Sequence, residues 1–266
     1  MNPPDAPAFA ASPHPSALRF PLLDAHVDHV THAIFTRRGG VSAPPLDSLN
    51  VSYSVGDNLE AVAENRARCA AALGLTSSVI VSAGLIHKAA VARVEHAVLQ
   101  PLPDGSRLVE DVDGLITAKP GIGLLITAAD CLQVLLYDPE IPAIGIAHAG
   151  WRGLAAGVVS ATVAAMTLAF GSRPAHMLAG IGPGLGPCCA QFTDPTHELP
   201  SWFAPYIHGR HVDLWAAARA QLADAGLERP HIEQHALCTV CNRDQFFSHR
   251  GDHGRTGRFA AIIALH

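Results

Sequence analysis

Short apolar segments bounded by Gly, Pro or Asp recur along the chain, and their many β-branched residues predict β-strands. The expected strands cover residues 34–36, 79–82, 89–94, 124–127, 133–137, 143–147, 177–181 and 259–265. They come in runs with few helices between them, whereas a doubly wound parallel sheet alternates strand and helix. We therefore expect an α/β (α+β) fold, a single layered sandwich of mixed β-sheets flanked by helices.

Two helices are expected from the residues at their ends. Asp57 can accept hydrogen bonds from the free amides of a first helical turn, and Glu60 stands three residues later, as in a capping box. Gly74 is a typical stop for this helix. Another helix is expected over residues 213–225.

The longest apolar stretch, residues 154–170, predicts a third helix that follows a Gly-rich turn at Gly150 and Gly153. The stretch is shorter than the roughly 18–20 residues that cross a bilayer, and it contains Ser and Thr. We therefore expect a buried amphipathic helix ending near Phe170 and no membrane span.

The composition excludes several classes of protein. Of the 266 residues, 49% are hydrophobic and 15% are charged, so the chain can bury a core and is not intrinsically disordered. The 18 Lys and Arg residues are outnumbered by 23 Asp and Glu, which gives a net charge of −5. This balance argues against binding to nucleic acid or to anionic lipid, because both need a basic surface.

Residues 1–19 are expected to be a disordered N-terminal lead. They are rich in Pro and contain no Lys or Arg before Arg19, so they do not resemble a secretion signal. The length allows residues 20–266 to form one domain. Six Cys residues without a secretion signal indicate thiols in a reducing compartment, so we expect a cytoplasmic protein.

A Gly-rich segment, residues 180–186, has some likeness to a dinucleotide-binding loop. The G-x-G-x-x-G template requires a third Gly where this chain has Leu185 or Pro187. The chain also lacks a Walker A lysine loop, a G-x-S-x-G elbow and an H-E-x-x-H motif. Conventional nucleotide-binding and serine-hydrolase functions are therefore excluded.

Cys238 and Cys241 form a single C-x-x-C motif. A structural zinc site needs a second pair, and Cys188 and Cys189 are adjacent, which is a poor spacing for joint capture of an ion. Packed, reduced thiols are therefore the favoured interpretation, with a redox or zinc role as the alternative.

Three other residues form a candidate metal site. Cys131 lies at an Asp-containing break between two expected strands, His148 lies where a strand ends and a helix begins, and His87 lies between two further strands. One thiolate and two imidazoles are a plausible zinc set with an open fourth position, the pattern of catalytic zinc. The residues alone leave open a small core Cys and solvated His side chains.

Several short motifs occur in order along the chain. They include Phe35-Thr36-Arg37-Arg38-Gly39-Gly40, Asp113-Gly114, Thr127-x-x-Asp130-Cys131-Leu132, His148-Ala149-Gly150-Trp151-Arg152-Gly153, Cys238-Thr239-x-Cys241 and Arg255-Thr256-Gly257-Arg258. With these motifs the chain resembles the laccase-domain family, first described as multicopper polyphenol oxidases and later as purine nucleoside phosphorylases. The resemblance covers roughly residues 30–265.

The resemblance implies that His87, Cys131 and His148 are metal ligands, for Zn²⁺ or alternatively Cu²⁺. It implies a layered sandwich that acts on purine nucleosides and inorganic phosphate. The implied activities are phosphorolysis of adenosine, inosine, guanosine and S-methyl-5'-thioadenosine, together with adenosine deamination. The chain departs from the family pattern around the ligands, with Leu85, Lys88 and Gln133 at positions where Gln, Gly and Pro are usual.

Roles follow for four other residues. Asp130 neighbours a ligand and is a candidate proton shuttle for deamination, or a cap that positions the ligand. Arg37 and Arg152 are candidate phosphate-binding residues, since guanidinium groups and helix N-termini favour anions. Asn50 is a candidate hydrogen-bonding partner for the substrate, or a turn residue.

Three rival functions remain. A copper-dependent polyphenol oxidase would use the same trio but normally adds an axial Met, and no Met lies near the ligands in the sequence. A hydrolase that edits peptidoglycan precursors would use Cys131 as nucleophile and His148 as base. A non-catalytic binding module is the third. The preferred nucleoside and the oligomeric state are left open by the sequence.

Overall fold

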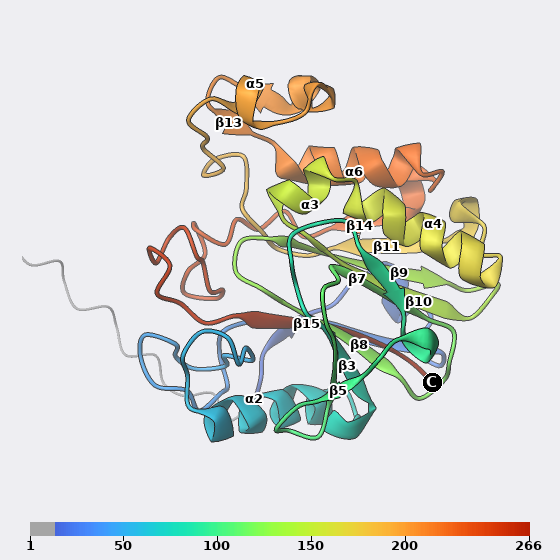
Figure 1. Ribbon diagram of the computed structural model, residues 1–266, viewed down its shortest axis with the longest axis vertical. Helices are drawn as coiled ribbons and strands as arrows, with labels where there is room; N and C mark the ends of the chain where they lie inside the picture. The colour runs from blue at the N-terminus through green and yellow to red at the C-terminus, as the bar shows by residue number, and fades with distance from the viewer. Residues whose placement is uncertain (1–13) are drawn as a thin grey trace, which may run out of the picture.

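The structure is a computed structural model in which residues 14–266 are described. Two mixed β-sheets are stacked between helices, so the molecule has four layers (Figure 1). Helix α2 (Leu59–Ala72) covers the outer face of one sheet, and helices α3 (Trp151–Ala155), α4 (Val158–Phe170) and α6 (Leu214–Asp224) cover the outer face of the other. The expected layered sandwich of mixed sheets is confirmed.

The first sheet has seven strands and is built around a strand from the end of the chain. Its order is β1 (Ala17–Leu18), β2 (Val30–Phe35), β15 (Phe259–Leu265), β8 (Gly123–Ala128), β3 (Ile80–Ala83), β6 (Arg107–Val109) and β5 (Gln100–Pro101). β15 follows every other strand in the chain, yet it pairs antiparallel with both β2 and β8.

The second sheet has six strands, and the chain passes between the two sheets several times. Its order is β14 (Ile232–Gln234), β11 (Leu178–Ile181), β9 (Leu132–Asp138), β10 (Ala143–Ala149), β7 (Gly114–Thr117) and β4 (Val91–Arg93). β3 is joined in sequence to β4, and β8 is joined to β9, so both connections carry the chain from the first sheet to the second.

The described residues also form short elements at the periphery. They are α1 (Pro21–Asp24), α5 (Pro195–Glu198), the 3₁₀ turns η1 (Ser77–Val79), η2 (Val94–His96), η3 (Pro174–His176), η4 (Ser201–Tyr206) and η5 (Arg229–His231), and the hairpin of β12 (Ile207–His208) and β13 (His211–Val212).

The period-two alternation of a strand explains how β15 serves two cores. Ile263 and its alternate neighbours face the second sheet and pack among side chains such as Leu135 and Ile146. Ile262 faces the other way and packs with Cys69 of α2. Because both faces are covered, the whole strand is buried, and this is why its sequence is a continuous apolar run.

Helix α2 begins one residue later than expected. Asn58 is its N-cap and accepts a hydrogen bond from the Ala61 amide at 2.9 Å, so Asp57 does not cap the helix. The carboxylate of Asp57 instead accepts hydrogen bonds from Asn50 and Ser42, at 2.8 and 2.6 Å. Asn and Asp both favour the N-cap, and the tertiary contacts of Asp57 decide between them.

The long helix expected up to Phe170 is divided into α3 and α4. Gly157 separates them with a φ of 82°, a left-handed conformation that ends the first helix and precedes the second. The expected strand over residues 89–94 is similarly shorter, because β4 passes into the turn η2 after Arg93.

The folded chain begins before residue 20. Residues 1–13 of the expected disordered lead lie outside the described residues. Ala17 and Leu18, however, pair with Phe35 and Ile34 as strand β1. No helix in the described part of the chain is long and apolar enough to pass through a bilayer.

Candidate active site

Two of the segments that cross from the first sheet to the second bring His87 and Cys131 to the same place. His87 lies in the segment that joins β3 to β4, and Cys131 lies in the segment that joins β8 to β9. His148 comes from the end of β10, where it is paired in register with Gln133 of β9. The site is therefore built by the topology of the sandwich, not by a contiguous motif.

The trio offers three possible metal-ligating atoms that lie within 4.8 Å of one another, one each from His87, Cys131 and His148. The two imidazole rings meet edge to face, with centroids 4.9 Å apart. Gly150 keeps this space open, because a Cβ at that position would lie 2.6 Å from the Cys131 sulfur. Two imidazole nitrogens and a thiolate are suitable ligands for a transition metal, so the trio could hold an ion.

Asp113 organises the trio, and its role is not visible in the sequence pattern. Its carboxylate accepts hydrogen bonds from the amides of His87 and Lys88, at 2.9 and 2.7 Å. The Nδ1 atom of His148 lies 2.9 Å from the same carboxylate, which leaves Nε2 as the donor for an ion. The hydrogen bond that the carboxylate accepts from the His87 amide also offsets the energetic cost of the left-handed backbone at His87, whose φ is 60°.

The charges within the trio are interdependent. Burial tends to raise the pKa of Cys131, but the charge and hydrogen bonds of His148 and His87 outweigh it and lower the pKa to about 6. Burial tends to lower the pKa of His148, but Cys131 and Asp113 raise it to about 9. Without an ion the pair therefore favours thiolate and imidazolium at neutral pH. The thiolate is the form that binds metal, and Nε2 of His148 loses its proton when an ion binds.

Asp130, the proposed proton shuttle, has its carboxylate occupied by three donors. The Thr239 and Ser248 hydroxyls each donate to Oδ1 at 2.6 Å, and the Arg250 amide donates to Oδ2 at 2.7 Å. The residue has a φ of 87° at the turn that presents Cys131. These contacts suit the positioning alternative better than proton transfer.

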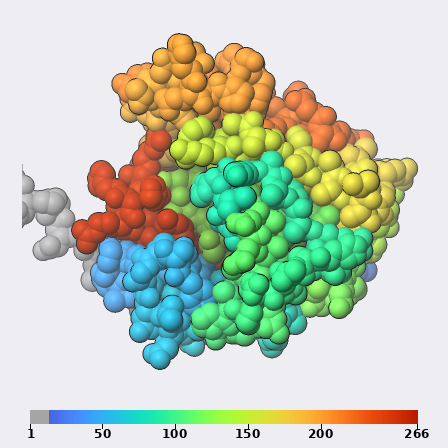
Figure 2. All heavy atoms as spheres, viewed as in Figure 1, coloured from blue at the N-terminus to red at the C-terminus, as the bar shows by residue number. Residues whose placement is uncertain are grey.

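A cavity of about 730 Å³ opens beside the trio, and it is lined by segments that are far apart in the sequence. In Figure 2 the surface is hollowed where the blue, teal, yellow-green and red segments meet. Its volume is within the range of sites that enclose small organic ligands. Tyr53 and the buried Arg66 line it as well as the trio, so one molecule could contact both groups.

Arg152 and Arg258 supply positive charge to the cavity. The Arg152 guanidinium lies over the Trp151 ring, 4.1 Å from its centroid. The Arg258 guanidinium is fixed by donating to the carbonyls of Thr256 and Gly257, at 3.0 and 2.9 Å. Burial lowers the pKa of Arg258, and the negative charges of Cys131 and Asp130 oppose that shift.

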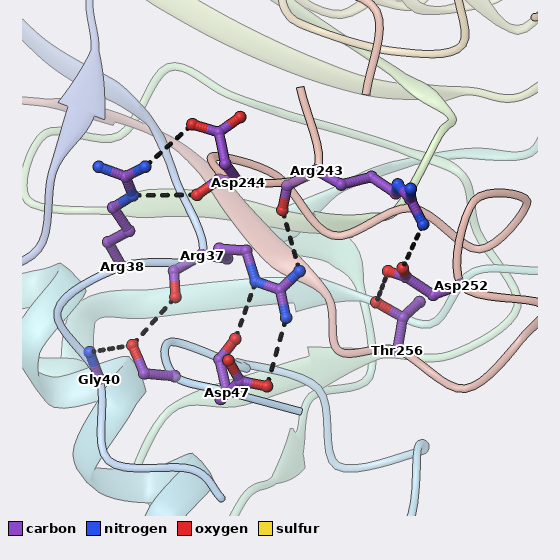
Figure 3. A network of polar contacts seen from close by, with 9 residues as sticks. Arg37, Arg38, Gly40, Asp47, Arg243, Asp244, Asp252 and Thr256 are labelled. Carbon is purple, nitrogen blue, oxygen red and sulfur yellow. Dashed lines mark hydrogen bonds and ion pairs between the residues drawn. The ribbon is translucent and has the colours of Figure 1, made fainter. Parts of the chain in front are cut away.

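Arg37 and Asn50 do not line the cavity. The Arg37 guanidinium donates to the carbonyls of Asp47 and Arg243, at 2.9 and 3.0 Å (Figure 3). It also lies over the Phe247 ring. Asn50 is buried, donates to Asp57 and accepts from the Arg258 amide at 2.9 Å. Both side chains thus hold loops together. For Asn50 this agrees with the turn role considered from the sequence. For Arg37 it argues against the phosphate-binding role that was expected.

Two of the departures around the trio have structural explanations. The buried Gln133 side chain donates to the carbonyls of Cys131 and Pro183, at 2.5 and 3.0 Å, and so fixes the Cys131 backbone. Lys88 contributes its amide to Asp113, a contact that any residue except Pro could make. Leu85 lines the cavity and presents an apolar surface to its contents.

The chain is similar to known proteins over most of its length. The family model described as "Multi-copper polyphenol oxidoreductase laccase" matches residues 31–266. A protein of Deinococcus radiodurans named "Purine nucleoside phosphorylase" is 38% identical, over 92% of this chain and 93% of its own length. "Purine nucleoside phosphorylase YlmD" of Geobacillus stearothermophilus is 35% identical, over 86% of this chain and 87% of its own length.

Solved structures show the same fold. The hypothetical protein YfiH of Bacillus licheniformis superposes with a TM-score of 0.81 at 34% identity, covering 89% of this chain and 93% of that one. The YlmD structure from Geobacillus stearothermophilus superposes with a TM-score of 0.78 at 31% identity, covering 89% of this chain and 92% of that one.

Proposed function

The chain belongs to the multi-copper polyphenol oxidoreductase laccase family, and we propose that it is a zinc-dependent purine nucleoside phosphorylase. The observation that carries the proposal is the cavity in which His87, Cys131 and His148 lie with Arg152 and Arg258. The names of the relatives point to the same activity. The proposed substrates are adenosine, inosine, guanosine and S-methyl-5'-thioadenosine, each with inorganic phosphate.

Phosphorolysis needs an anion held next to the glycosidic carbon. In the reaction a phosphate oxygen forms a bond to C1′ of the ribose, while the bond from C1′ to the purine nitrogen breaks. Arg152 and Arg258 are suited to hold the phosphate, because guanidinium groups form charge-assisted hydrogen bonds to it. The backbone hydrogen bonds of Arg258 fix its guanidinium before the anion arrives.

We assign the metal position to His87, Cys131 and His148. A zinc ion there would supply Lewis-acid chemistry to the bound nucleoside and phosphate. The residues around the trio hold its geometry: Asp113 orients the His148 ring, and Asp130 fixes the turn before Cys131. The thiolate-imidazole donor set suits zinc, and it also binds copper.

Adenosine deamination is proposed as a second reaction at the same position. Attack of water at C6 of the purine expels ammonia, so this reaction needs no phosphate. A chromatographic assay of the zinc-loaded protein with adenosine separates the two activities. We expect adenine and ribose 1-phosphate only when phosphate is present, and inosine with or without phosphate.

The Cys131→Ala variant tests whether one site performs both reactions. We expect loss of both activities and of the zinc held by the trio, with an unchanged circular dichroism spectrum. A variant that has lost zinc from this site but still cleaves adenosine with phosphate would refute the shared site.

The copper-dependent polyphenol oxidase is less well supported by the structure. Met166 and Met177 are both buried in the core beneath the helices, and neither lines the cavity, so neither is placed as an axial ligand. Over residues 14–266, the only other cluster that could hold a metal consists of thiols, not of the additional histidines that a multicopper centre needs. Intense visible absorption with one bound copper per trio would favour the oxidase instead.

The hydrolase that edits peptidoglycan precursors would use the same two side chains differently. The lowered pKa of Cys131 beside His148 is a property that a nucleophilic cysteine also needs. The two functions differ in how Cys131 reacts when zinc is bound. A nucleophile would be alkylated by iodoacetamide despite saturating zinc, whereas a metal ligand would be protected.

The remaining expectations are also proposals. We propose that residues 14–266 act as one catalytic unit in the cytoplasm, with small-molecule partners and no nucleic acid. The net charge of −5 supports the absence of nucleic acid, and six cysteines without a secretion signal favour a reducing compartment.

A further inference from the structure

Four cysteines lie together in space, although their spacing in the sequence is poor for binding one zinc ion. Their four sulfur atoms all lie within 4.8 Å of one another, and the residues are Cys188, Cys189, Cys238 and Cys241. The adjacent position of Cys188 and Cys189 therefore does not prevent convergence, contrary to the expectation from spacing. This cluster is separate from the trio, since the two share no residue.

The distances between sulfurs distinguish a shared ion from a disulfide. Cys241 Sγ lies 3.6 Å from the sulfur of Cys188 and 3.6 Å from that of Cys189. A disulfide bond is about 2.05 Å long, so neither pair is bonded. In a tetrahedral zinc site with bonds of about 2.3 Å, the sulfur atoms are about 3.8 Å apart. The observed spacing is close to the second value.

Two turns joined by backbone hydrogen bonds present the four thiols. The amides of Cys189 and Ala190 both donate to the Gly186 carbonyl at 2.9 Å, which curls the first turn. The second turn is closed by the Asn242 amide, which donates to the Cys238 carbonyl at 3.0 Å. The side-chain amide of Asn242 donates to the same carbonyl at 2.8 Å.

The two turns are also fixed to each other. Gly184 donates to the Leu237 carbonyl and accepts from the Thr239 amide, at 3.2 and 3.1 Å. Gly186 permits the close approach, because a Cβ there would lie 2.9 Å from the Cβ of Cys238. The thiols are thus held near one another by the backbone, which lowers the entropic cost of capturing an ion.

We propose that Cys188, Cys189, Cys238 and Cys241 form a tetrathiolate zinc site. Four thiolates complete a tetrahedral shell, so the site is structural and has no position for a substrate. Zn²⁺ displaces the thiol protons to solvent as the zinc–sulfur bonds form, and no electrons are transferred. Cys188 and Cys241 are exposed, which provides a path for the ion to enter.

This zinc site would stabilise residues that line one side of the cavity. Thr239, between the two cysteines of the second turn, donates to Asp130, and Arg250 donates to the Cys189 carbonyl at 2.8 Å. Asp130 in turn precedes Cys131 of the trio. The proposed ion therefore supports the turn that presents a residue of the active site, although the proposal does not depend on which reaction occurs there.

The test removes the trio so that any remaining zinc reports on the cysteine cluster. A His87→Ala, Cys131→Ala, His148→Ala triple variant is purified with Zn²⁺ and a reductant, desalted, and analysed for metal and by X-ray absorption. We expect one zinc per chain, bound by four sulfurs at about 2.3 Å. Absence of zinc from the folded triple variant, or an ion with nitrogen or oxygen ligands, would overturn the proposal.

Two further variants in the same background assign the zinc to its ligands. Adding Cys238→Ser and Cys241→Ser should remove the ion, whereas adding Cys69→Ala, which alters a buried cysteine of neither cluster, should leave it in place. Retention of the zinc after the Cys238 and Cys241 changes would also overturn the proposal.

A measurement on the unaltered chain avoids dependence on the folding of variants. Peptide mapping after brief treatment with iodoacetamide compares the chain with and without a chelator that removes Zn²⁺. We expect zinc to slow alkylation of Cys188 and Cys241 by more than tenfold. Equal alkylation in both conditions, or a mass shortfall of two hydrogens that marks a disulfide between these cysteines, would contradict a zinc site.

Discussion

Asp113 connects the two histidines of the trio through the backbone of one and the ring of the other. It accepts the amides of His87 and Lys88 and lies 2.9 Å from His148 Nδ1. Hydrogen bonds from the amides and from His148 lower its pKa even though burial tends to raise it. Its charge is therefore kept, and with it the orientation of the ring.

The Asp113→Asn variant should lower zinc affinity at the trio, or nucleoside activity, by about tenfold to a hundredfold, as outer-shell changes do at other metal centres. The amide has one oxygen in place of two, so it cannot serve both histidine segments. Asp138→Asn provides a matched control, since Asp138 is equally buried but accepts only the amides of Glu140 and Ile141. Equal activity per folded molecule in the two variants would exclude the orienting role.

The Arg258→Gln variant should raise the KM for phosphate with little change in nucleoside binding. The loss of one charge-assisted hydrogen bond, about 1.5–3 kcal/mol, corresponds to roughly a tenfold to hundredfold increase. Steady-state kinetics with varied phosphate measures it. Arg37→Gln should leave this KM unchanged and lower only the stability, because Arg37 contacts Asp47 and Arg243. The reverse result would return the phosphate site to Arg37.

At the residue scale, the sequence was sufficient to predict that His87, Cys131 and His148 lie close together. Side chains at strand ends converge where the chain crosses between the sheets. Prediction from the sequence could not identify the role of Asp113, because that role depends on amides that are 25 and 26 residues away. It misplaced Arg37 for a related reason. A guanidinium suited to an anion is equally suited to carbonyls, and only the packed loops show which partner it has.

Among the secondary-structure elements, the division between α3 and α4 is the main difference from the expected pattern. The apolar run through residues 154–170 predicts one helix, and the single Gly within it is compatible with a helix at a modest cost. The structure instead places Gly157 at a φ of 82°. The strand Phe259–Leu265 was predictable to the residue, because its run is apolar on both faces and nothing polar competes there. The expected strand over residues 34–36 instead begins at Val30 and ends at Phe35.

The Gly157→Ala substitution should destabilise the protein by about 1–2 kcal/mol, the cost of a left-handed backbone for an L-residue. No atom lies within 4 Å of the added Cβ, so the cost is purely conformational. Urea unfolding measures the difference. Gly171→Ala, at a φ of 78° after α4 and in similarly open space, should cost the same. A negligible change at Gly157 would show that α3 and α4 can fuse into one helix.

At the scale of the whole molecule, a buried histidine in the first sheet links folding to pH. This residue, His32, lies within strand β2 of that sheet. It is fully buried, and its Nε2 accepts the Phe20 amide at 2.8 Å, so the neutral ring is required. Burial lowers its pKa to about 4, helped by the positive charges of Arg19 and His235 and opposed by Asp24.

Stability should therefore fall as the pH is lowered. Between about pH 6.5 and pH 4 the unfolded chain binds a proton at His32 that the folded chain does not, so acid favours unfolding. A shift of this size corresponds to at most about 3 kcal/mol lost across that window. Denaturant unfolding at several pH values measures it, and His32→Gln, which keeps an acceptor without the titration, should show a shallower slope. Identical slopes would exclude His32 as the source.

The position of β15 has a consequence for how the chain is made. Because β15 follows every other strand in sequence and pairs between β2 and β8, those two strands have open edges until residues 259–265 emerge from the ribosome. Exposed apolar edges of this kind promote aggregation. A chain that lacks residues 259–265 should therefore aggregate instead of folding, because β2 and β8 then each lose a paired neighbour.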